Sequence, residues 1–195
     1  MIYAVVLAAG ASTRMAAHGP KALLRGPDGR TFVTRVVETA RAAGAGGVVV
    51  VVGPPHGDAI KRALPTGAVA VVNPRPERGM LSSVQAGVRE LPAATSAVLI
   101  WPVDVPYVEV ETARAILAAA PGKLVIPQHG AGEKKRGGHP VRVPRARFAE
   151  LMALDPEAGL KALVDAKPAN VERLTVADKQ ILVDIDTPED FARKS

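Results

Sequence analysis

The chain has 195 residues, of which 48% are apolar, 23% are charged and 3% are aromatic, and it contains no cysteine. This length suits one domain with a continuous core, and the lack of cysteine excludes disulfides, thiolate metal sites and cysteine nucleophiles. The formal net charge of +6 favours anionic partners. The 25 Lys and Arg residues are spread along the chain without aromatic stacking platforms, so phosphorylated small molecules or a merely solvated surface explain them better than nucleic acid.

No apolar run reaches the ~20 residues that a membrane-spanning helix needs. Residues 2–9 could pass for the apolar part of a signal peptide, but no basic segment precedes them and the run is short. We interpret this run as the first strand and expect a cytoplasmic protein with no membrane partner.

Short apolar runs predict strands at residues 3–7, 48–52, 69–72, 98–101 and 124–126. The run 48–52 is five consecutive valines, which is typical of a strand buried on both faces of a parallel sheet.

Helical stripes of apolar residues lie between these runs. They are Phe32, Val36, Ala40 and Ala43, stopped by Gly44; Leu81, Val84, Val88 and Leu91; and Val110, Ala113, Ile116, Leu117 and Ala120, stopped by Pro121. Alternating strands and helices predict right-handed βαβ units. We therefore expect an α/β fold over residues 1–195, a single domain whose mostly parallel twisted sheet carries helices on both faces.

The pattern changes after residue 127. Residues 129–138 are polar and glycine-rich, and we interpret the basic part as a solvated loop. Further strands are expected at 141–143, 171–174 and 181–183, and helices around 148–152 and 160–164. Thr187, Pro188 and Asp190 predict a capped start of the last helix.

Familiar phosphate and zinc motifs are missing: the chain has no G-x-G-x-x-G, no P-loop, no G-x-S-x-G and no H-E-x-x-H. In open α/β sheets, ligands bind beyond the carboxyl ends of the strands. The candidate ligand segments are therefore 8–21, 53–54, 73–80, 102–106 and 184–187.

The segment after the first strand is built for close backbone approach, because residues 8–12 are all small. Arg14 and Lys21 then supply two cations that suit phosphate oxygens. The alternative is a surface turn with solvated cations.

Two carboxylates follow strand ends. Asp104 could hold Mg²⁺, although an aspartate in a turn before proline is the alternative. Asp186 offers a second carboxylate, and strand alternation would point Asp184 the same way. Asp184 or Asp190 could be purely structural.

Ser82 and Ser83 precede a helical stripe, where free N–H groups and hydroxyls could bind a base, ribose or phosphate. The alternative is that Ser82 caps this helix. Gly87 inside the helix indicates close packing on a neighbour or ligand.

Together these segments resemble the MobA-like nucleotidyltransferase superfamily, and within it the molybdenum cofactor cytidylyltransferases. The resemblance rests on LAAGASTRM at 7–15 with Lys21, GMLSSVQAG at 79–87, PVDVP at 102–106, GHPV at 138–141 and DIDTPED at 184–190. The chain departs from the family pattern at Ala16, at Val103 and in the length of the approach to Lys21.

The resemblance implies a Rossmann-like GT-A fold and Mg²⁺-dependent transfer of CMP from CTP to a phosphorylated acceptor, molybdopterin, with release of pyrophosphate. It implies Asp104 and Asp186 as metal ligands, His139 as an acceptor contact, and Arg14, Lys21 and Asp104 as the catalytic set. Nucleotide contacts would be Leu7, Ala8, Ala9, Gly10, Ser12, Arg14, Lys21, Asn73, Ser82 and Ser83.

Other functions stay open. A related transferase could use GTP or another acceptor, and a nucleotide-binding regulator or cofactor chaperone could keep the pocket without turnover. We expect a monomer or weak oligomer with transient contact to a molybdoenzyme.

Overall fold

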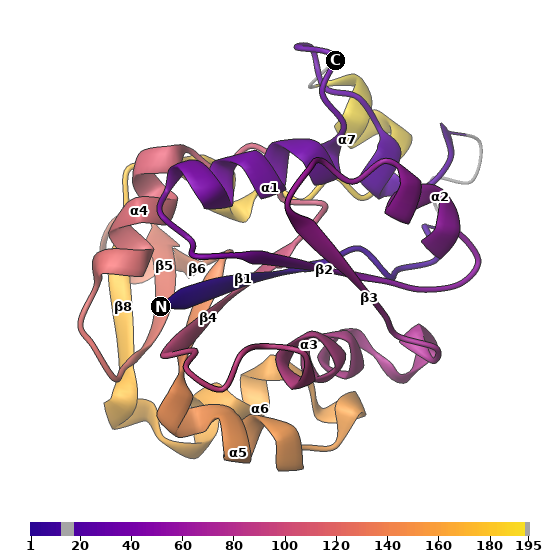
Figure 1. The fold of residues 1–195 in the computed structure, drawn as a ribbon. Coiled ribbons are helices and arrows are strands. Elements are labelled where there is room, and N and C mark those ends of the chain that lie inside the picture. Colours follow the sequence, from indigo (N-terminus) through magenta and orange to yellow (C-terminus); the bar gives the residue numbers. More distant parts are fainter. Residues whose placement is uncertain (13–17, 194–195) are drawn as a thin grey trace.

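A computed structural model describes residues 1–12 and 18–193, and its centre is an eight-stranded sheet (Figure 1). The strand order is β3-β2-β1-β4-β7-β5-β6, and β8 pairs with β5. The strands are β1 Ile2–Leu7, β2 Val48–Val52, β3 Ala68–Val72, β4 Ala97–Pro102, β5 Leu124–His129, β6 Arg136–Gly137, β7 Val141–Pro144 and β8 Val171–Thr175.

The sheet is mostly parallel, as predicted. Strands β3, β2, β1 and β4 run parallel to one another, and β8 runs parallel to β5. Strand β7 is inserted antiparallel between β4 and β5. The five valines of β2 are all buried, because β2 has a strand on each side and helices over both faces.

Helices cover both faces of the sheet: α1 and α4 with α7 on one, and α3, α5 and α6 on the other (Figure 1). Their bounds are α1 Phe32–Ala42, α2 Gly57–Arg62, α3 Met80–Arg89, α4 Val110–Ala118, α5 Phe148–Ala153, α6 Gly159–Ala166 and α7 Pro188–Ala192. Alternate residues of β1 supply the two cores: Ala4 and Val6 pack with α1, whereas Val5 and Leu7 pack with α3. No helix within the described residues is both long and apolar enough to cross a membrane.

Two C-terminal expectations differ from the structure. Residues 181–183 do not form a strand, because Asp178 starts a 3₁₀ turn, Lys179–Leu182, by accepting hydrogen bonds from the backbone N–H groups of Gln180 (2.8 Å) and Glu109 (2.9 Å). Part of the expected loop at 129–138 is paired, since β6 bonds to the end of β5. The capped start of α7 at Thr187 is confirmed, including its capping box with Asp190.

Gly87 packs on the sheet. A Cβ there would lie 2.5 Å from Cγ1 of Val5 and 2.9 Å from Cγ2 of Val51. Gly87 therefore allows α3 to pack closely on strands β1 and β2.

Gly87→Ala should lower the stability of the fold. The gain in helix propensity is ~1 kcal/mol, but overpacking two stiff, buried valines costs ~1–3 kcal/mol. Thermal unfolding should show a lower Tm. The matched control is Gly57→Ala in α2, where the nearest atom to a new Cβ is 3.7 Å away; that variant should keep or raise the Tm. Equal Tm values for the two variants would contradict this account.

Candidate functional site

The site lies where β1 and β4 leave the sheet side by side. Leu7 pairs with Pro102, and the N–H of Val103 donates to the carbonyl of Leu7 at 3.1 Å. The segment that carries Gly10 follows β1, and the segment that carries Asp104 follows β4. The two segments therefore begin at neighbouring strand ends. This is the strand-end position that the sequence predicted.

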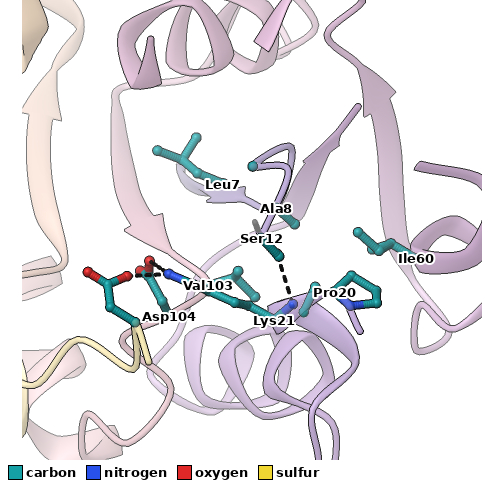
Figure 2. Close-up of a pocket in the computed structure, with 11 residues that line it drawn as sticks. Leu7, Ala8, Ser12, Pro20, Lys21, Ile60, Val103 and Asp104 are labelled. Carbon is teal, nitrogen blue, oxygen red and sulfur yellow. Dashed lines mark hydrogen bonds and ion pairs between the residues drawn. The ribbon is translucent and has the colours of Figure 1, made fainter. Parts of the chain in front are cut away.

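Ser12 closes the loop after β1. Its Oγ accepts the backbone N–H of Lys21 at 3.0 Å, which joins the two ends of the segment between them (Figure 2). Ser12 has a φ of 52°, a left-handed conformation that is uncommon outside glycine. Arg14 and Ala16 lie outside the described residues.

Lys21 contacts two carboxylates at once. Its Nζ lies 3.3 Å from Oδ2 of Asp104 and also pairs with Oδ1 of Asp186. Figure 2 shows the ammonium of Lys21 pointing at Asp104. The Lys21 side chain is 16% exposed, against 28% for Asp104 and 39% for Asp186. Three residues that are distant in sequence thus share one half-buried cluster.

Asp186 is held by its own segment. The N–H of Ile185, which is fully buried, donates to the carbonyl of Asp104 at 2.8 Å. Asp190 accepts from the N–H of Asp186 (3.3 Å) and from Thr187, and the Thr187 hydroxyl holds the pKa of Asp190 below its usual value. Asp190 therefore caps the start of α7, which is the structural role that the sequence left open for it.

Asp184 lines the same hollow as Asp186, although the strand expected before them is missing. Loss of hydration and then the negative charges of Asp104 and Asp186 raise the pKa of Asp184. The local potential is therefore negative despite Lys21.

Asp104 and Asp186 fit a divalent ion. Both reach a single cation, the Lys21 ammonium, and Mg²⁺ in enzymes takes one or two carboxylates plus substrate phosphates and waters. Among residues 1–12 and 18–193, no three His, Asp or Glu side chains converge as a closed metal cage. The protein would thus supply part of a coordination shell that the substrate completes.

The cleft has two compartments, of about 180 and 360 Å³. Both are lined by Leu7, Gly10, Asp104 and Asp186. The first adds Ala8, Ser12 and Lys21, and the second adds Ala9, Ser83, His139 and Asp184. The two carboxylates therefore stand between two binding spaces.

His139 belongs to the second compartment. Its N–H donates to the carbonyl of Ile181 at 2.9 Å, and its buried Nδ1 has no partner among the described residues. Burial lowers the pKa of His139, and the charge of Asp104 partly opposes this shift. Burial thus favours the uncharged form of the ring, which has one donor and one acceptor nitrogen.

Of the other predicted nucleotide contacts, the structure brings Ser83 into the cleft but not Asn73 or Ser82. The buried Asn73 amide donates to the hydroxyls of Ser82 (2.8 Å) and Ser83 (3.0 Å). The helix N-cap is Gly79, not Ser82, whose hydroxyl instead donates to the Gly79 carbonyl at 2.7 Å. Asn73 and Ser82 therefore brace the wall of the cleft.

Sequence reasoning missed the short helix α2, whose Ile60 lines the first compartment (Figure 2). Its six residues are too few for a clear periodic stripe. Met80, 53% exposed at the start of α3, lines the second compartment and belongs to the candidate ligand segment 73–80.

Comparison with known proteins gives matches over most of the chain. Residues 4–172 match the family described as MobA-like NTP transferase domain. Bifunctional protein GlmU of Methylibium petroleiphilum is 35% identical over 127 residues, which are 63% of this chain and 27% of that protein, so the chain spans about a quarter of that relative. The 2-C-methyl-D-erythritol 4-phosphate cytidylyltransferase of Streptomyces avermitilis is 30% identical over 197 residues, 97% of this chain and 69% of that protein.

Among solved structures, Rv0371c from Mycobacterium tuberculosis H37Rv superposes with a TM-score of 0.85 and 29% identity, over 98% of this chain and 95% of that one. The same protein in complex with manganese gives a TM-score of 0.80 and 28% identity, over 98% and 96% of the two chains.

The proximity of His139 and Asp104 is testable by NMR titration of the imidazole. His139 should titrate below its usual 6.5, because burial disfavours the charged ring. Asp104→Asn should lower that pKa further, since it removes the charge that favours the imidazolium. Asp165→Asn on the exposed surface of α6 should leave it unchanged. A higher pKa of His139 in Asp104→Asn would contradict the proximity of these two side chains.

Proposed function

The chain belongs to the MobA-like NTP transferase family, and from this premise we propose that it is a Mg²⁺-dependent nucleotidyltransferase that moves CMP from CTP to a phosphorylated acceptor. Molybdopterin is our first candidate acceptor, and residues 1–195 act as one domain. The observation that carries the proposal is the convergence of Asp104 and Asp186 on Lys21, between two compartments.

In the proposed reaction an acceptor phosphate oxygen attacks the α-phosphorus, the new P–O bond forms, the bond to the β-phosphate oxygen breaks, and pyrophosphate leaves. Such transfers need positioning and charge neutralisation more than covalent help. Asp104 and Asp186 would hold the Mg²⁺, which would supply positive charge to neutralise the nucleotide phosphates.

The chain's own groups divide the remaining tasks. Lys21 lines the first compartment beside the loop of small residues 8–12, so this side suits the triphosphate. Arg14 is the second proposed phosphate ligand. Leu7, Ala8, Ala9, Gly10, Ser12 and Ser83 would surround the nucleotide, and Asn73 and Ser82 would support Ser83. His139 would hydrogen-bond the acceptor through Nδ1.

A second acceptor has specific support. The Streptomyces avermitilis relative, which aligns with 97% of this chain, is a cytidylyltransferase for 2-C-methyl-D-erythritol 4-phosphate. That name favours CTP and offers a polyol phosphate as an alternative to molybdopterin. We keep the cytoplasm as the proposed location, and a monomer or weak oligomer with transient contact to a molybdoenzyme as the proposed assembly.

The nucleotide is tested by thermal shift with CTP, GTP, ATP and UTP in the presence of Mg²⁺. CTP should raise the Tm most, because binding to the folded state stabilises it by mass action. A larger shift with GTP would overturn the cytidylyl assignment. Pyrophosphate release with molybdopterin or 2-C-methyl-D-erythritol 4-phosphate then identifies the acceptor. Tight CTP binding without release with any acceptor would favour a non-catalytic regulator.

Asp104→Asn should reduce pyrophosphate release by ~10²–10³-fold or more, the loss typical of removing one electrostatic group from an active site. Its far-UV circular dichroism should match the parent, because the carboxylate lies in the cleft and not in the core. Asp165→Asn is the matched control and should keep full turnover. Turnover at the parent rate in Asp104→Asn would contradict the assignment of Asp104 as a metal ligand.

Lys21 should compete with the metal, because its ammonium contacts the carboxylates that would bind it. In the absence of nucleotide, Lys21→Met should bind Mn²⁺ more tightly than the parent, by roughly fivefold if the ion pairs are together worth about 1 kcal/mol. Titration calorimetry measures this directly. Lys61→Met on α2 serves as the control and should bind Mn²⁺ like the parent. Unchanged or weaker Mn²⁺ binding in Lys21→Met would contradict the competition.

A further inference from the structure

A second hollow of about 310 Å³ lies between the end of β3 and the outer side of α3. It is lined by the strand end at Val72, by the residues that follow it and by Pro156. None of its described lining residues belongs to either compartment of the cleft. The volume lies at the lower end of the range for small-molecule sites.

The hollow is basic. Arg75, Arg78 and Arg89 line it, with Glu90 as the one carboxylate among its described lining residues. None of these three guanidinium groups forms an ion pair or a side-chain hydrogen bond with residues 1–12 or 18–193, whereas Arg147 pairs with Glu150 elsewhere on the molecule. Three unpaired guanidinium groups around one concavity create a positive potential that attracts an anion.

Gln85 adds a hydrogen-bond acceptor. Its side chain is 4% exposed, and its Nε2 donates to the carbonyls of Leu151 (3.1 Å) and Leu154 (2.9 Å). These two bonds fix the orientation of the amide. Its Oε1 accepts no hydrogen bond from a described residue. This oxygen keeps some exposed surface, so it can accept a hydrogen bond from a ligand that enters the hollow.

We propose that this hollow binds a small phosphate monoester that carries hydroxyl or amino groups. The phosphate would lie among Arg75, Arg78 and Arg89, where guanidinium groups can hold its oxygens in pairs. A hydroxyl or amino group would donate to Gln85 or Glu90. The exposed Val72 and the ring of Pro156 leave room for an apolar part.

The hollow lies back to back with the cleft. Pro76 and Met80 line the second compartment of the cleft, while Arg75 and Arg78, from the same segment, line the hollow. The Asn73 amide, in the wall of the hollow, donates to the hydroxyl of Ser82, which lines the hollow, and to the hydroxyl of Ser83, which lines the cleft. A ligand in the hollow therefore orders a wall that the cleft shares.

The test is an NMR titration of ¹⁵N-labelled protein with ribose 5-phosphate, and with inorganic pyrophosphate as a charge probe. The backbone amides of residues 71–78 and 85–90 should shift and saturate. Arg78→Gln and Arg89→Gln should each weaken binding by about tenfold, since each removes charged hydrogen bonds. Arg62→Gln is the matched control, because Arg62 is exposed on α2 and lines neither the hollow nor the cleft.

Shifts confined to residues 7–12 and 102–104 would mean that these anions bind only in the cleft, and would overturn the proposal. Unchanged affinity in both arginine variants would do the same. Binding of a single-stranded oligonucleotide that the arginine variants abolish, without saturable binding of ribose 5-phosphate, would assign the hollow to nucleic acid instead. The mapping is independent of turnover, so it stands or falls separately from the proposed reaction.

Discussion

The contact of Lys21 with Asp104 and Asp186 is the interaction on which the rest of the site depends. It joins the loop after β1, the turn after β4 and the segment before α7. Unit charges 4 Å apart attract by ~4 kcal/mol at the effective dielectric of a protein surface, but partly exposed pairs net only ~0–1 kcal/mol. At 28% and 39% exposure of the acids, the cluster adds little to stability. Its consequence is geometric, because it fixes where two carboxylates meet.

The surroundings of this cluster are asymmetric. The first compartment is lined by Lys21 and the loop of small residues, whereas the second is lined by Asp184 and His139 and has no Lys or Arg among its described lining residues. Phosphate charge is therefore best accommodated on the Lys21 side, next to the carboxylates and the metal proposed for them. Hydrogen-bonding groups of an acceptor suit the other side. Nucleotidyl transfer needs such a division, because two anionic substrates must meet at one phosphorus.

Several residues around the cleft hydrogen-bond or pack within its frame. Asn73 and Ser82 hydrogen-bond within the wall between the cleft and the basic hollow, and Asp190 caps α7 so that Asp186 is presented. Gly87 serves close packing of α3 on β1 and β2. Positioning of this kind matters, because reacting groups displaced by about 1 Å can lose on the order of 10² in rate. Of the two sequence relatives, the Streptomyces avermitilis protein is named for one acceptor, 2-C-methyl-D-erythritol 4-phosphate.

The sequence by itself determined the alternation of strands and helices, the buried valine strand and the segments after β1 and β4 that carry Lys21 and Asp104, because periodicity and turn chemistry are local properties. It failed at residues 181–183, where Asp178 binds a distant N–H, and at α2, which is too short to show a stripe. Tertiary structure alone decided the antiparallel insertion of β7, the hydrogen bonds of Asn73 to Ser82 and Ser83, and the three-arginine hollow. It also decided the burial of His139 Nδ1, which has no partner among the described residues. Each depends on which distant segments become neighbours, and local sequence patterns carry no information about that.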